Sequence, residues 1–317
     1  MRETKGMRRL TAVGAILALT GVACGSNAPA KDGLSGTING DGSSTVFPIT
    51  EAVAEEFRLE NPGVNVTVGV SGTGGGFEKF CAGETDFSDA SRPIKQDDEV
   101  PVCRDNDVDF VELQVANDGL AVVVNTENDW ATCLTVEELN KIWEPGSDVK
   151  DWSQVRDGFP NEPMTFYSPG TDSGTFDYFT DVINGEEGAS RNDRLVTFSE
   201  DDNTLVTGVE GDTGAIGYFG FAYYAENAEQ LNLVQVDGGD GCVTPSDETV
   251  KGGEYAPLSR PLFVYVRDEA TQRPEVKAFF DFYLAIVNEL LGDVGYTPLS
   301  DEQIAAEVAD WEGFVGA

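Results

Sequence analysis

Three short runs of small hydroxyl and glycine residues are the part of this chain best suited to chemistry. They are Gly42-Ser43-Ser44-Thr45, Ser71-Gly72-Thr73-Gly74-Gly75-Gly76 and Thr171-Asp172-Ser173-Gly174-Thr175. Each run leads into an apolar stretch with helical spacing, and a helix start exposes unpaired N–H groups and about half a positive charge. Three such starts directed at one point would hold a compact oxyanion with few basic side chains.

The composition limits which partners and reactions fit these runs. The 317 residues carry 57 acidic and 20 basic side chains and no histidine, for a net charge of −37. This acidity argues against nucleic acid and anionic lipid as electrostatic partners. It leaves an anionic ligand open, because salt screens exposed charges beyond roughly 8 Å while donors act at contact distance. Without histidine, a Gly-x-Ser-x-Gly elbow or C-x-x-C spacing, we expect no enzyme, no metal site and no cofactor.

The N-terminus has the pattern of an export signal. Four basic residues precede the apolar run 10–19, which is too short to span a bilayer, and Leu19-Thr20-Gly21-Val22-Ala23-Cys24 follows. The pattern resembles a bacterial lipoprotein signal, with 1–23 removed, Cys24 lipidated and 24–35 as a polar tether. It predicts an extracytoplasmic protein anchored to the outer face of the membrane; an ordinary secretory signal with an incidental cysteine is the alternative.

Extended and helical segments alternate along the rest of the chain. This alternation predicts an α/β fold with largely parallel sheets. Two lobes that face each other across a cleft would bring the three distant runs together, and we place the crossings at 114–119 and 238–253. Lobe 1 is then 36–115 plus 257–317, and lobe 2 is 116–256. The predicted strands are 64–70, 109–115, 120–125, 164–167, 231–236 and 262–267, and the predicted helices are 49–59, 136–143, 176–183, 275–291 and 301–311.

Four cysteines remain after Cys24, an even number that predicts two disulfides in an exported chain. They allow three pairings. We prefer Cys81–Cys103 and Cys133–Cys242, because each pair stays within one predicted lobe.

In this order, the three runs resemble the substrate-binding proteins of bacterial phosphate ABC transporters, with nearly the whole mature chain covered. Such a resemblance implies a type II periplasmic-binding-protein fold with a double crossover hinge. It further implies a monomer that closes on inorganic phosphate and passes it to the permease subunits. The other matching segments are 86–93, 117–125, 139–143, 168–175, 202–206 and 214–224.

The resemblance also implies which residues contact phosphate. In the first run, a threonine side chain and backbone amides hold phosphate oxygens; in the second, Thr73 is the hydroxyl donor, with Ser71 close enough to compete. A Ser-Gly-Thr cluster completes the site from the second lobe. The predicted phosphate-binding set is Ser44, Thr45, Val46, Ser71, Thr73, Ser91, Arg92, Ser173, Gly174 and Thr175.

Two departures from the family pattern change the electrostatics of this site. Ser91 stands where well-known members place a proton-accepting acid, and Pro169 stands where they place an arginine. We predict that Arg92 supplies the missing positive charge, and that Asp89 or Asp172 accepts the proton of phosphate.

The identity of the oxyanion depends on that acceptor. Phosphate at neutral pH keeps a proton and needs an acceptor, whereas sulfate, molybdate and tungstate are satisfied by donors alone. A carboxylate facing the ligand therefore favours phosphate, and we expect sulfate to bind at least about tenfold more weakly. A binding protein for another tetrahedral oxyanion, or a phosphate sensor without transport, is the alternative.

Overall fold

The computed structural model describes residues 33–171 and 173–316. The predicted signal 1–23, most of the tether, Cys24 and Asp172 lie outside the described residues. Within that described part, no helix combines the length and apolar character needed to cross a bilayer.

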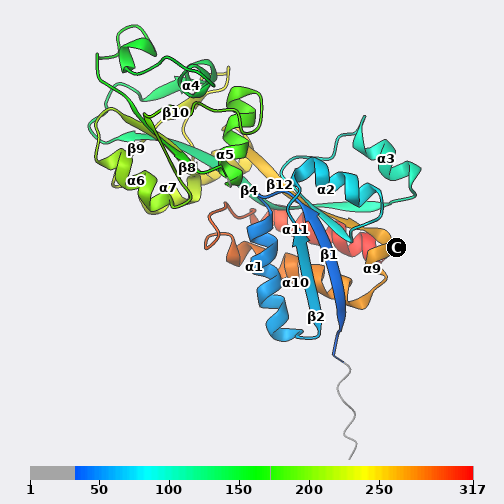
Figure 1. Ribbon diagram of the computed structural model, residues 1–317. Coiled ribbons are helices and arrows are strands. Elements are labelled where there is room, and N and C mark those ends of the chain that lie inside the picture. Colours follow the sequence, from blue (N-terminus) through cyan, green and yellow to red (C-terminus); the bar gives the residue numbers. More distant parts are fainter. Residues whose placement is uncertain (1–32, 172, 317) are drawn as a thin grey trace, which may run out of the picture. The chain divides into compact units, whose positions relative to one another are not determined.

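Lobe 1 is built on a sheet whose neighbouring strands are β2, β1, β3, β12 and β4 (Figure 1). β1 runs parallel to β2 and β3, while β12 is antiparallel to β3 and β4. Buried Val53, Phe57 and Phe279 from the covering helices pack with Ile38 of the sheet. The elements are β1 (Gly36–Gly42), α1 (Phe47–Glu60), β2 (Val64–Gly69), α2 (Gly72–Cys81), β3 (Phe87–Ala90), α3 (Glu99–Asp105), β4 (Phe110–Asn125), β12 (Ser259–Arg267), α9 (Asp268–Thr271), α10 (Pro274–Leu290) and α11 (Asp301–Val315).

Lobe 2 has a separate core, in which the buried Trp143, Phe179 and Tyr218 make ring contacts. Its main sheet contains the second half of β4 with β8, β6, β7 and β9, and a smaller sheet joins β11, β10 and β5. The elements are β5 (Cys133–Thr135), α4 (Val136–Trp143), η1 (Trp152–Gln154), β6 (Thr165–Pro169), α5 (Gly174–Phe179), η2 (Thr180–Asn184), β7 (Val196–Ser199), α6 (Asp202–Glu210), β8 (Ala215–Gly220), α7 (Phe221–Glu226), β9 (Leu231–Leu233), β10 (Gln235–Asp237), β11 (Cys242–Val243) and α8 (Asp247–Gly252).

One long strand, β4, connects the two lobes. It pairs with β12 as far as Gly119 opposite Ser259, and with β8 from Leu120 opposite Gly220 onward. The strands predicted at 109–115 and 120–125 are thus a single strand. The predicted α/β fold with two lobes is confirmed. The prediction of largely parallel sheets holds for β1 with β2 and β3 and for β6 with β7 and β8, but it was wrong for β4 and β12, which are antiparallel to their neighbours.

The predicted second crossing at 238–253 was wrong too. That segment contains β11 and α8, and Val250 of α8 is buried in the core of lobe 2. The chain therefore returns to lobe 1 after α8, in the stretch before β12 begins at Ser259.

Both preferred disulfides are confirmed. Cys81–Cys103 joins α2 to α3, and Cys133–Cys242 joins β5 to β11 across a sequence separation of 109 residues. The second bond joins the two outer strands of the smaller sheet of lobe 2.

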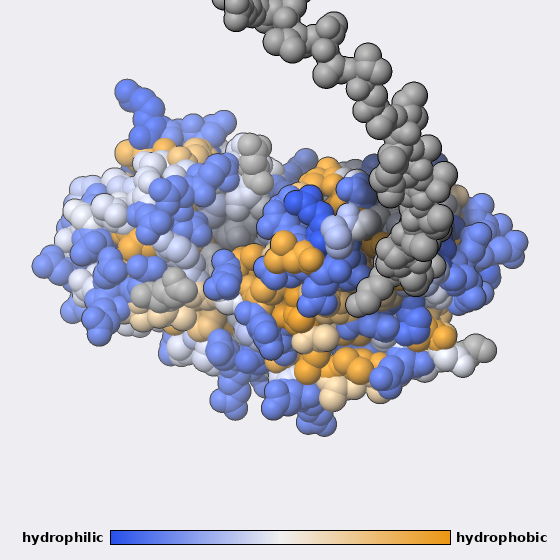
Figure 2. Space-filling model, turned by 90° about the horizontal axis from the view of Figure 1, so that it is seen from below, coloured by the Kyte–Doolittle hydropathy of each residue, from blue (hydrophilic) through white to orange (hydrophobic). Residues whose placement is uncertain are grey.

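The surface itself gives little indication of function. Figure 2 shows hydrophilic side chains over much of one face, with apolar residues gathered on part of it. Large apolar side chains that are exposed include Leu59, Val70, Val102 and Phe198, which come from separate elements. Isolated apolar residues of this kind are normal on protein surfaces, so function is better sought in the cavity between the lobes.

Candidate anion-binding site

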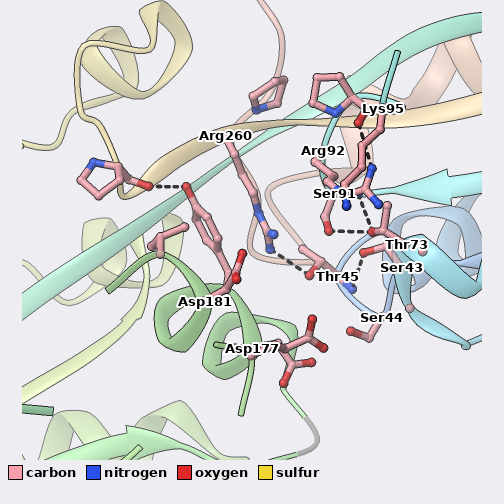
Figure 3. A pocket seen from close by; sticks show the side chains of 18 of the residues that line it. Ser43, Ser44, Thr45, Thr73, Ser91, Arg92, Lys95, Asp177, Asp181 and Arg260 are labelled. Carbon is pink, nitrogen blue, oxygen red and sulfur yellow. Dashed lines mark hydrogen bonds between the residues drawn. The ribbon is translucent and has the colours of Figure 1, made fainter. Parts of the chain in front are cut away.

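A cavity of about 780 Å³ lies where the two lobes meet (Figure 3). Lobe 1 lines it with the first two runs and the segment after β3, and lobe 2 with α5, η2 and the residues after them. Its hydroxyls come from Ser43, Ser44, Thr45, Ser71, Thr73, Ser91, Tyr178 and Ser259, its cations from Arg92, Lys95 and Arg260, and its carboxylates from Asp177, Asp181 and Glu187.

The first run forms a fixed turn that leads into α1. The Thr45 amide donates to Ser43 Oγ at 3.2 Å, and the Tyr296 hydroxyl donates to the Thr45 carbonyl at 2.7 Å. Val46 precedes the first residue of α1, and no side chain caps this helix. The amides of Phe47, Ile49 and Thr50 donate to the carbonyls of Ser43 and Val46, and Pro48 has no N–H. Among the described residues, the amides of Ser44 and Val46 have no hydrogen-bond acceptor, and amides placed in this way before a helix can bind an anion. The Val46 side chain is buried in the core, so only its backbone can serve the site.

In the second run, Ser71 and Thr73 face different partners. Both the amide and the hydroxyl of Ser71 donate to Asp41, which also pairs with Lys79 at 2.5 Å. Burial acts to raise the pKa of Asp41, but the hydrogen bonds from Lys79 and Ser71 outweigh it and lower that pKa. Ser71 lines the cavity, but its proton is already donated, which leaves Thr73 as the donor of this run.

Thr73 Oγ1 lies 2.9 Å from Ser91 Oγ and accepts the Ser91 amide at 3.1 Å. This contact brings the second run against the segment after β3. Two predicted site residues far apart in sequence thus lie side by side, as Figure 3 also shows.

The third run meets the first across the lobes. A Cβ added to Gly174 would lie 2.9 Å from Thr45 Cα and 3.0 Å from Thr45 N, so only glycine fits at this distance. Ser173 Oγ accepts the Thr175 amide at 3.2 Å. Thr175 lines a second, smaller cavity beside the first, together with Asp118 and Asp202.

Thr45 and Thr73, which line the cavity, share one hydrogen-bond pattern with Ser173, which is not among the lining residues. Thr45 Oγ1 accepts from Arg260 at 3.0 Å, Thr73 Oγ1 accepts the Ser91 amide, and Ser173 Oγ accepts the Thr175 amide. A hydroxyl oxygen that accepts from an N–H leaves the hydroxyl proton for another acceptor. Thr73 Oγ1 and Ser91 Oγ lie 2.9 Å apart, so one of these two hydroxyls donates to the other and one proton remains for a ligand. The cavity therefore presents donors, which is what an oxyanion requires.

The cation predicted to serve this site is already paired. Arg92 lines the cavity, but both of its terminal nitrogens donate to Glu99, at 2.9 and 2.7 Å. The hydrogen bond to Glu99 raises the pKa of Arg92, and burial only partly opposes this effect.

Arg260 is the functional candidate that sequence reasoning missed. It donates to Thr45 and forms an ion pair with buried Asp118 at 3.1 Å. Burial raises the pKa of Asp118, and the charge of Arg260 opposes that rise. The run Pro257-Leu258-Ser259-Arg260-Pro261, with an arginine between prolines, is the signal that could have drawn attention to it.

The structure does not favour Asp89 as proton acceptor. Its carboxyl is fully buried in lobe 1, where Oδ1 accepts from Thr50 at 3.0 Å, and it does not line the cavity. Burial raises the pKa of Asp89 to about 8, a neutral acid rather than an acceptor at neutral pH. Asp89 lies within β3 and faces Thr50 of α1, whereas Ser91 lies beyond the end of that strand, against Thr73. Asp177, Asp181 and Glu187 line the cavity instead.

The chain is similar in sequence to a known protein superfamily and to individual proteins within it. A model described as a PBP superfamily domain matches residues 27–285. The chain is 52% identical to the protein SphX of Synechocystis sp., over 86% of this chain and 81% of that protein. It is 37% identical to the phosphate-binding protein PstS of Staphylococcus saprophyticus, over 96% of this chain and 93% of that protein.

Solved structures of proteins described as phosphate-binding are also similar to this chain. A possible phosphate binding protein from Planctomyces limnophilus is 48% identical and superposes with a TM-score of 0.85, over 89% of this chain and 99% of that one. An ABC-type phosphate transport receptor from Vibrio cholerae superposes with a TM-score of 0.66 over 82% of this chain and 99% of that one. At 22% identity, the second likeness supports the two-lobed fold alone.

Proposed function

Since this chain belongs to the PstS family of phosphate-binding proteins, we propose that it binds inorganic phosphate outside the cytoplasm and delivers it to an ABC permease. The observation that carries the proposal is that Thr45 and Thr73 of lobe 1 and Ser173 of lobe 2 each accept an N–H at the hydroxyl oxygen, and that the donor to Thr45 is Arg260. We further propose a monomer that carries out no catalysis, needs no cofactor and is held to the membrane through lipidated Cys24.

Ligand binding would bring donors from both lobes onto one anion. The amides of Ser44 and Val46 just before α1, the hydroxyls of Thr45 and Thr73, and Ser173 would replace the water shell of phosphate. Ser44, Ser91, Gly174 and Thr175 complete the proposed cradle. Arg92 lines the cavity and remains a proposed contact of phosphate. Its attraction for the anion is weaker, because the Glu99 carboxylate pairs with its positive charge.

Calorimetry on phosphate-stripped protein tests the proposal. Phosphate is expected to bind at micromolar or tighter affinity, with sulfate at least about tenfold weaker. Equal affinities for the two anions would favour a binding protein for sulfate-like oxyanions, since a donor-only site does not distinguish them.

We propose that Asp177 accepts the proton of phosphate, because it lies in the first turn of α5 and lines the cavity. Replacing Asp177 with Asn is expected to lower phosphate affinity about tenfold and to raise sulfate affinity, because sulfate no longer meets a carboxylate. Calorimetry with both anions measures the ratio. Glu187→Gln, which removes another carboxylate from the same cavity, is the control and is expected to leave that ratio unchanged; an unchanged ratio in Asp177→Asn would refute the assignment.

Thr73→Val should weaken phosphate binding about fivefold, which is the loss of one neutral hydrogen bond. Thr67→Val on β2 is the matched control, because the Thr67 hydroxyl bonds to Asn39 outside the cavity. Titration of both variants by calorimetry distinguishes a lost donor from a general effect of the substitution. If the two variants bind phosphate equally, Thr73 is not a donor to the ligand.

A further inference from the structure

We propose that Arg260, held by Asp118, is the positioning residue that makes the Thr45 hydroxyl a donor to the bound anion and is itself the main cation that anion meets. The inference rests on the proposed phosphate-binding function. It concerns an arginine on a crossing strand, outside the three runs and outside the predicted site.

The two partners face each other where the lobes join. Arg260 of β12 lies opposite Asp118 of β4 in the antiparallel register. Nε and Nη2 of Arg260 donate to the same carboxylate oxygen, at 3.2 and 3.1 Å, and the side chains are 16% and 3% exposed. A buried ion pair of this kind holds the guanidinium in one place. If holding the strands together were its whole role, however, the guanidinium would need no contact beyond Asp118.

The guanidinium extends past Asp118 to the first run. Its Nη2 donates to Thr45 Oγ1 at 3.0 Å. Because arginine has no acceptor, Thr45 must be the acceptor in this bond, and its own proton is left to donate elsewhere. Thr45 is 4% exposed, and hydrogen bonds to Ser43 and from Tyr296 hold its backbone in place. The bond from Arg260 therefore limits the directions in which the Thr45 hydroxyl can point its proton.

Part of the guanidinium is still available to a ligand. Among residues 33–171 and 173–316, Nη1 has no hydrogen-bond acceptor, and Arg260 lines the cavity. Two N–H groups of a fixed cation therefore remain for an anion beside Thr45. Arg92 differs in this respect, because Glu99 occupies both of its terminal nitrogens.

Lobe 2 covers the flat face of the same group. The Tyr178 ring of α5 lies 3.6 Å from the Arg260 guanidinium carbon, and the Tyr178 hydroxyl donates to the Pro257 carbonyl at 2.5 Å. A ring over the guanidinium face leaves only its edge for hydrogen bonds. Arg260 is thus in contact with the hinge, the first run and lobe 2 at once, where it can link ligand binding to the meeting of the lobes.

A double-mutant cycle tests the proposal, with phosphate affinity measured by calorimetry and stability measured by thermal unfolding without phosphate. Arg260→Lys keeps the charge beside Asp118 but loses the fork that reaches both Asp118 and Thr45. It is expected to lower affinity at least about tenfold. Thr45→Val should cost about fivefold or more in the wild-type background and less than about twofold in the Arg260→Lys background, because the hydroxyl is no longer oriented. Arg260→Gln should bind more weakly than Arg260→Lys.

The matched control is Arg156→Gln. Arg156 also pairs with a carboxylate, Glu138, and stacks on an aromatic ring, Phe159, but it does not line the cavity. Its affinity should stay within about twofold of wild type. Additive losses from Arg260→Lys and Thr45→Val, or an Arg260→Lys affinity within about threefold of wild type, would overturn the positioning role.

The wild-type titration separates failure of the inference from failure of the proposed function. If wild type prefers another tetrahedral anion, the function is wrong and the cycle is run with that anion, where the same non-additivity is expected. If wild type binds none of them, both ideas fall.

Discussion

Replacing Gly174 with alanine is expected to lower phosphate affinity about 10- to 100-fold while the protein stays folded. Gly174 begins α5 in lobe 2 and lies against Thr45 of lobe 1, where an added Cβ would be 2.9 Å from Thr45 Cα. That contact is backbone, which cannot move aside as the end of a flexible side chain can. The methyl group must push the lobes apart at the point where their donors meet, and donors displaced by a fraction of an ångström lose hydrogen-bond geometry.

The stability of the variant distinguishes this account from simple misfolding. The clash lies between lobes, each with its own buried core, so thermal unfolding without phosphate should change little. Gly313→Ala on α11 is the control, because nothing lies within 4 Å of its added Cβ. It should keep wild-type affinity and gain about 0.5–1 kcal/mol of helix stability. Wild-type affinity in Gly174→Ala would show that the lobes need not approach here to bind the anion.

Local sequence signals predicted the helices well. The helix predicted at 136–143 is α4, Val136–Trp143, because an amphipathic stretch there follows a capping box made by Thr135 and Glu138. The buried ring cluster of Trp143 and Tyr218 also follows from their apolar surroundings. Signals of this kind act within a few residues, and so they can be read without knowledge of the fold.

Pairing between distant segments could not be read in the same way. The direction of β12 depends on its return between β3 and β4, which no local pattern encodes, and the prediction of parallel sheets was wrong there. Asp118 and Arg260 are separated by 142 residues and meet only through this antiparallel register. Composition alone gives no reason to join them.

In the candidate site, too, local sequence signals predicted some residues, while others depend on contacts between distant segments. The three runs were predicted from hydroxyl and glycine content, and the first and third do meet at Thr45 and Gly174. Arg92 was predicted to supply the positive charge that is missing where this chain has Pro169 in place of the family's arginine. The fold instead directs it to Glu99, seven residues further along, and brings Arg260 to Thr45. Which charge reaches the cavity is decided by tertiary competition among carboxylates, and this chain has many of them.

Asp89→Asn is expected to change the pH dependence of stability more than any other single substitution proposed for this protein. The Asp89 carboxyl is fully buried, accepts from Thr50 at Oδ1, and has no partner for Oδ2 among the described residues. Burial is the main cause that raises its pKa to about 8; the charge of Asp41 adds to the rise, and the Thr50 hydrogen bond opposes it. Thr50 is itself 3.1 Å from the Tyr283 hydroxyl of α10, so these neutral groups surround the acid.

The sign of the effect follows from proton binding. Between about pH 4 and pH 8 the folded protein keeps the Asp89 proton while the unfolded chain releases it, so this group lowers the free energy of unfolding as pH rises. The expected slope is about 1.4 kcal/mol per pH unit, and it is fully present between the two pKa values. Asn has the same shape and no proton to lose, so Asp89→Asn should gain stability relative to wild type by that amount per unit from pH 5 to pH 7.5.

Urea unfolding of both proteins across this range measures the difference, with Asp105→Asn on α3 as a control for the loss of one exposed carboxylate. A stability difference that stays constant with pH would show that Asp89 is ionised in the folded protein.

Phosphate affinity of the same variant gives an independent test, because the Asp89 carboxyl lies outside the cavity while its carbonyl accepts the Ser43 amide at 2.9 Å. The variant should therefore bind phosphate within about threefold of wild type at pH 7, and a loss of about tenfold or more would restore Asp89 as the proton acceptor. If the slope is found, Asp89 is a neutral acid beneath the first run, and its burial keeps one negative charge away from the place where the anion is proposed to bind.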